Sequence, residues 1–382
     1  MKSKLGMKMM SAAFAAVLAA GSLAGCSTGA AGASAADQAS ESGTTQSETT
    51  AASSSAQAET EAKDAGSYAD TITIVWYPNE SAEDYDSARE EYGKLIEKAT
   101  GKKVEQQLTT DYTIAIESIA SGTAQIAFMG AEGYVQAKEK SGAVNPLFVN
   151  SGSSGTLDDA LYYSFLAVNQ GDEGEYASGS GYAIDNIAGK RMSFVSNSST
   201  SGFKVPVNTI IKHFSKDSQW ANLTVDDLIE GGGDKLFSEV LFGGSHQGSA
   251  FNLLSGKADV SAFCDTEIAP YADCTEGTEN TAGSIYTIKD DASAPFDTVT
   301  GKKFVVITST PVLNGPFAYN SKTLSPDDVK SIQDLFTSAE VAGNEKIFVP
   351  EGSEAVGMFE KADKEQFVLV DDSWYEPIRN ME

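Results

Sequence analysis

The sequence predicts an α/β protein of two lobes, each built on a doubly wound, mostly parallel β-sheet. Strand and helix patterns alternate from about residue 71, and the alternation starts again after a Gly- and Ser-rich stretch that follows residue 169. About 310 residues follow the low-complexity N-terminal part of the 382-residue chain, which is enough for two sizeable cores. Junctions near residues 169 and 308 predict two hinge crossings, with a ligand held between the lobes.

The first lobe is predicted from hydrophobic periodicity and from helix caps. Ser87 and Glu90 form a capping-box pattern for a helix that Gly101 ends, and Asp111 and Gly122 bound a second helix. In order, the expected elements are a strand at 71–76, a helix at 87–100, a strand at 104–108, a helix at 111–121, a strand at 124–129, a short helix at 135–138 and a strand at 161–169.

The second lobe repeats this rhythm, and the chain then returns to the first. Ser325 followed by Pro326 predicts the start of a last strong helix. The other expected elements are a strand at 191–195, a helix at 202–214, a helix at 249–254, a strand at 258–263 and a strand at 304–308. We therefore expect residues 70–168 with 309–382 to form the first lobe, and residues 169–308 the second.

The N-terminus indicates the compartment. Lys2, Lys4 and Lys8 precede a short apolar stretch at 9–20, which is typical of a signal peptide and too short for a bilayer span. Leu23-Ala24-Gly25-Cys26 resembles a lipobox, which predicts a signal peptide at 1–25 and a lipid on Cys26; the alternative is a secretory signal with a chance cysteine. Residues 26–69 are almost entirely small or polar, so we expect a disordered tether that holds the protein on the extracytoplasmic face of the membrane.

Composition narrows the range of functions. A formal charge of −27 excludes binding along a nucleic-acid backbone, and it also repels an anionic ligand at long range. Only two histidines are present, so a zinc enzyme has few ligands to use, and we expect no metal or cofactor. Cys264 and Cys274 allow either a disulfide or two free thiols, and the sequence leaves both open.

A hydroxyl-rich run lies between a predicted strand and a predicted helix, in Ser196-Asn197-Ser198-Ser199-Thr200-Ser201-Gly202-Phe203. Hydroxyl donors beside the unpaired N–H groups of a helix N-terminus can bind a tetrahedral oxyanion without a cation. The alternative is that one serine caps the helix and the others form a solvated turn.

Several motifs together carry a family resemblance. They are the Ser199–Phe203 run with Pro206, Thr110-Asp111-Tyr112, Gln125-Ile126-Ala127-Phe128, Tyr162 in a strand, and His246 followed by Ala258-Asp259-Val260. From about residue 71 to about 342, the chain resembles the phosphate/phosphite/phosphonate-binding lipoproteins of ABC importers. The resemblance implies a type II periplasmic-binding fold, a phosphorus oxyanion as ligand, and an ABC permease with its ATPase as partners. We expect a monomer.

The resemblance also implies roles for individual residues. Ser199, Thr200 and Ser201 would hold the phospho group, and Tyr112, Tyr162 and His246 would donate hydrogen bonds to it. An acidic residue about 20 positions beyond the histidine falls here at Thr266, which leaves Asp265 and Glu267 as candidates. The loop Leu313-Asn314-Gly315-Pro316 has no acid to hold an ammonium group, which favours phosphite, methylphosphonate or phosphate over aminoethylphosphonate.

Three further candidates for ligand binding are suggested only by their position in the sequence. Tyr77 and Asn79 follow the first strand, where a cleft would open, and Ser198 belongs to the hydroxyl run. We expect His213 to be structural, because it lies among apolar residues of a helix, and Arg191 to lie away from the cleft.

Other functions stay possible on the sequence. A sensor subunit would have the same fold, and another small anion such as a sulfonate could be the ligand. A hydrolase is less favoured, because no nucleophile elbow, dinucleotide-binding loop or Walker A loop is present. We therefore predict a binding protein and no enzyme.

Overall fold

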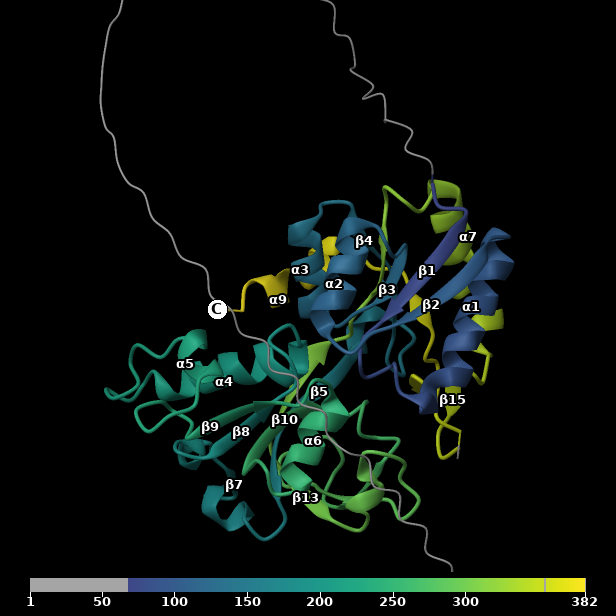
Figure 1. The fold of residues 1–382 in the computed structure, drawn as a ribbon. Helices are drawn as coiled ribbons and strands as arrows, with labels where there is room; N and C mark the ends of the chain where they lie inside the picture. Colours follow the sequence, from purple (N-terminus) through teal and green to yellow (C-terminus); the bar gives the residue numbers. More distant parts are fainter. Residues whose placement is uncertain (1–67, 354, 382) are drawn as a thin grey trace, which may run out of the picture. The chain divides into compact units, whose positions relative to one another are not determined.

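The computed structural model describes residues 68–353 and 355–381, and two β-sheets organise this part of the chain (Figure 1). The predicted signal peptide, Cys26 and the tether up to residue 67 lie outside the described residues. The six-stranded sheet has the order β17-β4-β14-β3-β1-β2, and the seven-stranded sheet has the order β11-β12-β13-β5-β10-β8-β9. Two α/β units are thus confirmed.

Helices cover both faces of the six-stranded sheet, because each face carries its own apolar cluster. The strands are β1 (Thr71–Trp76), β2 (Lys103–Leu108), β3 (Ile126–Phe128), β4 (Val144–Asn150), β14 (Phe317–Asn320) and β17 (Phe367–Val368). One face packs against α1 (Asp86–Thr100), α7 (Pro326–Phe336) and α8 (Ala339–Ala342). The other packs against α2 (Tyr112–Ser121), α3 (Ala131–Lys140) and α9 (Glu376–Arg379).

The seven-stranded sheet is layered in the same way. Its strands are β5 (Leu161–Asn169), β8 (Arg191–Phe194), β9 (Glu239–Phe242), β10 (Val260–Cys264), β11 (Ala272–Glu276), β12 (Ile285–Ile288) and β13 (Lys303–Leu313). One face packs against a π-helical turn η5 (Thr200–Lys204), α4 (Val205–Phe214) and α5 (Val225–Ile229). The other face packs against α6 (His246–Leu254).

Small elements complete the described fold. Two-stranded pairs are formed by β6 (Ala177–Ser178) with β7 (Gly181–Tyr182), and by β15 (Phe348–Pro350) with β16 (Phe359–Lys361). Short 3₁₀ turns are η1 (Glu83–Tyr85), η2 (Leu157–Asp159), η3 (Glu173–Tyr176), η4 (Asp185–Ile187), η6 (Phe296–Thr298) and η7 (Asp372–Tyr375).

Both sheets are mixed, and the expectation of mostly parallel sheets was wrong. β1 pairs in parallel with β2 and β3, whereas β14 runs antiparallel to β3 and β4. In the seven-stranded sheet, β8 pairs in parallel with β9 and β10, while β5, β11, β12 and β13 form antiparallel pairs. Most of the antiparallel pairs join strands that are far apart in the sequence, such as β14 with β3 and β13 with β5, and the apolar pattern of a single strand does not contain this information.

Helix starts were predicted with uneven success. Asp111 caps α2 as expected, since its Oδ1 accepts a hydrogen bond from Thr113 N at 2.6 Å. Ser325 caps α7 in the same way, accepting from Asp328 N at 3.1 Å. The capping box at Ser87 was wrong: α1 begins at Asp86, directly after η1, and no side chain caps it. The preceding 3₁₀ turn supplies the geometry that a cap would otherwise provide.

The connections between the two sheets run beside each other. Asn314 N donates to Ala160 O at 3.0 Å, directly after β13 and directly before β5. Both strands pair within the seven-stranded sheet along their whole length, whereas the expected lobe boundaries at 168/169 and 308/309 divide them. The pairing favours crossings near residues 160 and 314, and we take these as the proposed lobe boundaries.

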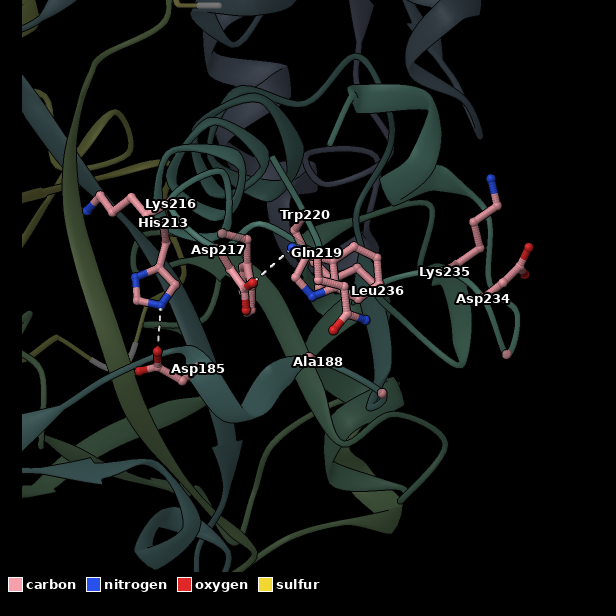
Figure 2. Close-up of a pocket in the computed structure, with 13 residues that line it drawn as sticks. Asp185, Ala188, His213, Lys216, Asp217, Gln219, Trp220, Asp234, Lys235 and Leu236 are labelled. Carbon is pink, nitrogen blue, oxygen red and sulfur yellow. Dashed lines mark hydrogen bonds and ion pairs between the residues drawn. The ribbon is translucent and has the colours of Figure 1, made fainter. Parts of the chain in front are cut away.

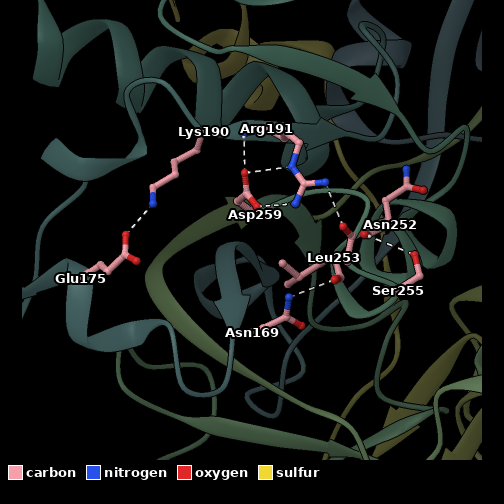
Figure 3. A network of polar contacts seen from close by, with 9 residues as sticks. Asn169, Glu175, Lys190, Arg191, Asn252, Leu253, Ser255 and Asp259 are labelled. Carbon is pink, nitrogen blue, oxygen red and sulfur yellow. Dashed lines mark hydrogen bonds and ion pairs between the residues drawn. The ribbon is translucent and has the colours of Figure 1, made fainter.

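Arg191 lies at the outer end of the seven-stranded sheet, as expected. Its guanidinium donates to Asp259 at 2.5 and 3.1 Å and to Gly256 O at 3.0 Å, which ties the start of β8 to the segment before β10 (Figure 3). Cys264 is buried and Cys274 is half-buried, and both are free thiols. Among residues 68–353 and 355–381, no helix is long and apolar enough to cross a bilayer.

Candidate functional site

A cavity of about 80 Å³ lies between the two sheets, and both contribute to its wall. This volume holds a few water molecules and is far below the roughly 300–1,000 Å³ of pockets for drug-sized ligands. It therefore suits a compact ligand. Eight of the residues singled out in the sequence line it: Tyr77, Asn79, Tyr112, Tyr162, Ser199, Thr200, His246 and Glu267.

Four helix N-termini converge on this cavity. Tyr112, Thr200 and His246 are the first residues of α2, η5 and α6, and Gly130 is the N-cap of α3; all four line the wall. Unpaired N–H groups and the helix dipole make each of these ends favourable for negative charge. No Lys or Arg is among the described residues that line the cavity, so these ends supply its positive potential.

Three hydroxyls in the cavity wall accept hydrogen bonds from the protein and keep their own protons available. Thr200 Oγ1 accepts from Glu132 N at 2.9 Å, and Ser199 Oγ accepts from Gly202 N at 3.1 Å. Tyr112 OH accepts from Asn79 Nδ2 at 2.8 Å, and burial raises the pKa of Tyr112 well above its usual range. A hydroxyl has one proton to donate, so each of these groups can still donate to a ligand.

His246 is fixed as a neutral donor. It is buried and begins α6, three residues before the helix expected at 249–254. Its Nδ1 accepts from Cys264 N at 3.1 Å, and burial lowers the pKa of His246 to about 3. A neutral ring with an accepting Nδ1 carries its proton on Nε2, which lies 3.5 Å from Ser199 Oγ.

Three buried hydroxyl groups lack hydrogen-bond partners among the described residues, namely Tyr77 OH, Ser201 Oγ and, in α1 and not at the cavity, Tyr92 OH. Tyr77 lines the cavity with its ring tilted by 32° against that of Tyr112, 4.1 Å away between ring centroids, and a Cβ on Gly133 would lie 1.8 Å from the Tyr77 hydroxyl. Burial raises the pKa of Tyr162, whose hydroxyl lies close to those of Ser201 and Thr200. Unsatisfied buried polar groups often mark the place of an absent ligand or water.

Three predicted residues do not line the cavity. Ser201 is buried directly beside the lining residue Thr200. Ser198 Oγ instead donates to Gln136 Oε1 at 2.9 Å. Asp265 Oδ1 accepts from Tyr163 N at 2.8 Å, and burial raises the pKa of Asp265 to about 7. Of the two acidic candidates, Glu267 is therefore the one at the cavity, together with Thr266.

Sequence reasoning missed one acidic and several apolar lining residues. Glu80 follows Asn79 after β1 and is 4% exposed; its place at the end of a strand is the signal that could have identified it. An apolar part of the wall consists of Phe128, Met129, Met358 and Phe359. Phe359 comes from β16 and contacts Phe128 edge-on at 5.9 Å, a pairing that nothing in the local sequence indicates.

Hydrogen bonds bridge the two sheet units around the cavity. His246 N donates to Asn79 Oδ1 at 3.1 Å, and the bond between Glu132 N and Thr200 Oγ1 also joins the two units. Farther out, Tyr271 OH donates to Asp84 Oδ2 at 3.0 Å. These bonds hold the cleft closed, so opening the cleft requires breaking them.

A second, larger hollow lies on the outer part of the seven-stranded unit (Figure 2). This groove has a volume of about 700 Å³, and its lining residues lie between 185 and 236. His213 lines it and pairs with Asp185 at 3.1 Å, a half-buried position consistent with the expected structural role. Among the described residues, no group of three or more His, Cys, Asp or Glu side chains could hold a metal ion.

Comparison with known proteins places the chain in a family. Residues 74–375 match the family model described as "ABC transporter, phosphonate, periplasmic substrate-binding protein". The chain belongs to this family. Its members are extracytoplasmic substrate-binding components of ABC transporters rather than enzymes, which confirms the prediction from the sequence motifs.

Individual relatives agree with this family. A phosphate-import protein PhnD from Mycolicibacterium smegmatis is 27% identical over 207 residues, a match that spans 53% of this chain and only 58% of the relative. The binding component of a Pseudomonas aeruginosa ABC phosphonate transporter has a TM-score of 0.55 at 18% identity, over 81% of this chain and 85% of that one. Prochlorococcus marinus PhnD1, solved with methylphosphonate, has a TM-score of 0.56 at 16% identity, over 82% and 97%. These structures confirm the periplasmic-binding fold.

Proposed function

We infer that this protein captures a phosphorus oxyanion in the cavity between its two sheets and delivers it to an ABC permease. The observation that carries this proposal is the arrangement of the donors. Ser199, Thr200 and Tyr112 each accept a hydrogen bond from a protein N–H and keep a proton for the ligand, and His246 Nε2, 3.5 Å from Ser199 Oγ, faces the same space. Such fixed neutral donors stabilise an anion without the solvent reorganisation that flexible groups require.

The proposed contacts follow from the position of each donor. Ser199 and Thr200 hold the phospho group, with Ser201 beside them, and Tyr112, Tyr162 and His246 complete the shell. Tyr77 and Glu267 contact the ligand from the wall. Ser198 and Asp265 act indirectly, because their side chains are bound elsewhere.

The size and the apolar part of the cavity favour a small ligand with at most a short apolar substituent. A volume of about 80 Å³ leaves little room beyond a tetrahedral oxyanion. Met358 and Phe359 offer contact surface for a methyl group, which inorganic phosphate lacks. We therefore propose methylphosphonate, phosphite and phosphate as candidate ligands. The Prochlorococcus marinus relative was solved with methylphosphonate, and the Mycolicibacterium smegmatis relative is named a phosphate-import protein.

The finer points of the proposal concern anchoring and assembly. A lipid on Cys26 would hold the protein at the membrane, with residues 26–69 as the tether and 1–25 removed as the signal peptide. We propose that the protein is a monomer and that its partners are a permease and an ATPase. A sensor role is the second possibility for the same site, and neighbouring genes for a permease and an ATPase would decide between them.

A panel of ligands tests the proposed function. The melting temperature of the full chain is measured with phosphate, phosphite, methylphosphonate, aminoethylphosphonate and sulfate. A ligand that binds only the folded state adds about 2.7 kcal/mol of stability at a hundred times its Kd. We expect a clear rise with one phosphorus oxyanion and none with sulfate. No rise with any phosphorus oxyanion contradicts the proposal, and a rise with sulfate alone assigns the site to another anion.

A further inference from the structure

Two buried carboxyl groups, one from each sheet unit, meet at the wall of the ligand cavity. Glu80 follows β1, Glu267 follows β10, and both line the cavity. Glu267 Oε2 accepts from Gln247 Nε2 at 3.2 Å and from Tyr85 OH at 3.3 Å. Glu80 is 4% exposed, and its Oε2 has no hydrogen-bond partner within residues 68–353 and 355–381. A buried carboxyl oxygen without a partner requires an explanation.

Apart from Arg89, the titratable groups around this pair carry no positive charge. The titratable groups that face Glu80 are Tyr77, Tyr85, Arg89 and Tyr112. Those that face Glu267, besides Tyr85, are Cys264, Asp265 and Tyr271. Burial raises the pKa of the tyrosines and of Cys264, so these groups stay neutral near pH 7. His246 also lines the cavity and stays neutral, because its pKa is lowered.

Arg89 does not neutralise the pair either. Its Nη1 donates to the carbonyl oxygens of Glu80 and Ala82, and its Nη2 pairs with the carboxylate of Asp86. An anionic ligand enclosed beside two carboxylates would therefore place three negative groups in one small, dry space. Like charges at such distances in a poorly solvated site are strongly unfavourable, so a proton must be held there.

We propose that Glu80 and Glu267 share one proton across the cleft, and that closing the cleft around the anion takes up this proton. Glu80 is thus a positioning residue for Glu267 and for the ligand, and it makes capture dependent on pH. The inference rests on the proposed capture of a phosphorus oxyanion. When the cleft is open, the two carboxyls separate into water and ionise at their ordinary pKa.

The electrostatics of the closed form agree with this geometry. Burial, together with the charge of Glu267, raises the pKa of Glu80 well above its usual value. Burial also raises the pKa of Glu267, whose carboxyl lies in hydrogen-bond range of Glu80. Because the closed form has the higher pKa values, its advantage over the open form is complete below the ordinary carboxyl pKa and is lost as the pH rises through the closed-form values.

Calorimetry of the full chain with methylphosphonate tests this inference. Kd and proton uptake are measured between about pH 5.5 and about pH 8.5, in buffers with different ionisation enthalpies, where one proton taken up changes affinity by tenfold per pH unit. We expect the wild type to take up as much as one proton more than Glu80→Gln, and its affinity to fall more steeply with pH. The titration of the free ligand is the same for both proteins and cancels in the comparison.

Two further variants keep the outcome decisive. Glu267→Gln should flatten the pH profile like Glu80→Gln, and it serves if Glu80→Gln fails to fold. Asp185→Asn, a carboxyl change in the outer groove, should have the same proton uptake and pH profile as the wild type.

The possible outcomes separate the two proposals. Binding with parallel pH profiles and equal proton uptake in all variants overturns this inference alone. Absence of binding of every phosphorus oxyanion in the wild type overturns the proposed function as well. Tighter binding of aminoethylphosphonate without proton uptake would assign an ammonium group to the pair instead of a proton.

Discussion

The ligand cavity and the outer groove differ both in volume and in the chemistry of their walls. The groove is nearly nine times larger, at about 700 against 80 Å³, but two of its lining side chains, His213 and Lys235, already have partners of their own. His213 pairs with Asp185, and Lys235 pairs with Asp227 and Glu230. In the cavity, by contrast, donors are held by the protein on one side and left open on the other. Volume alone therefore does not identify a site; polar groups without partners do.

The two hollows also differ in what encloses them. Residues of both sheet units line the cavity, so closing and opening of the cleft would change its solvation. The residues that line the groove all lie between positions 185 and 236, within a single unit. A ligand in the cavity can thus be linked to cleft closure, which is the signal a permease would need, whereas a ligand in the groove would leave the cleft unaffected.

Removing two hydrogen-bond donors from the cavity should change ligand affinity more than any other substitution in the cavity or the groove. In Thr200→Val with His246→Asn, a methyl group replaces the Thr200 hydroxyl, and the asparagine carbonyl can still accept from Cys264 N. Each lost hydrogen bond to a charged ligand contributes about 1.5–3 kcal/mol, so affinity should fall by at least about 100-fold. Titration calorimetry with the best ligand of the panel measures this, and the melting temperature of the unliganded variant checks its folding. Unchanged affinity would remove these two residues from the site.

Ser201 allows a sharper test, because its hydroxyl is buried without a partner. An unsatisfied buried polar group costs about 1–3 kcal/mol, so Ser201→Ala should stabilise the unliganded protein by about 1 kcal/mol. If Ser201 donates to the ligand, affinity should nevertheless fall by about tenfold. Denaturant unfolding and calorimetry measure the two effects separately.

Ser164 is the matched control for this test. Its buried hydroxyl donates to Ser201 O at 2.6 Å, so Ser164→Ala leaves an acceptor without its donor and should destabilise the fold. A stability loss in both variants would show that Ser201 has a protein partner in solution. Unchanged affinity in Ser201→Ala would place the ligand away from η5.

Two of the helix N-termini at the cavity could be predicted from the sequence because each lies in a local motif. Ser199 and Thr200 are adjacent, and Tyr112 follows the Asp111 cap, so neighbouring residues alone indicate a helix N-terminus. His246 was recognised by its motif, although its buried place at the start of α6 was not expected. The convergence of these helix ends depends on the folding of both sheets, and only the family resemblance implied it.

What could not be predicted depends on long-range pairing. Tyr85 and Glu267 are 182 residues apart, and Glu80 becomes significant only because the fold places its carboxyl beside that of Glu267. The same limit explains the wrong prediction about the sheets, because strand direction is set by connections and partners and not by apolar alternation. Phe359 shows the limit again, since β16 reaches the cavity from the C-terminal part of the chain.

The smallest effect is expected from a substitution in the outer groove. Asp185→Asn removes the carboxylate that contacts His213 in the groove while keeping the shape of the side chain. The Asp185 side chain is 70% exposed, and such a pair contributes at most about 1 kcal/mol, so we expect a stability change below about 0.5 kcal/mol. Ligand affinity should stay within about twofold of the wild type, because groove and cavity share no lining residue. A tenfold change in affinity, measured by the same calorimetry, would show that the groove is coupled to the closing of the cleft and that the two hollows do not act independently.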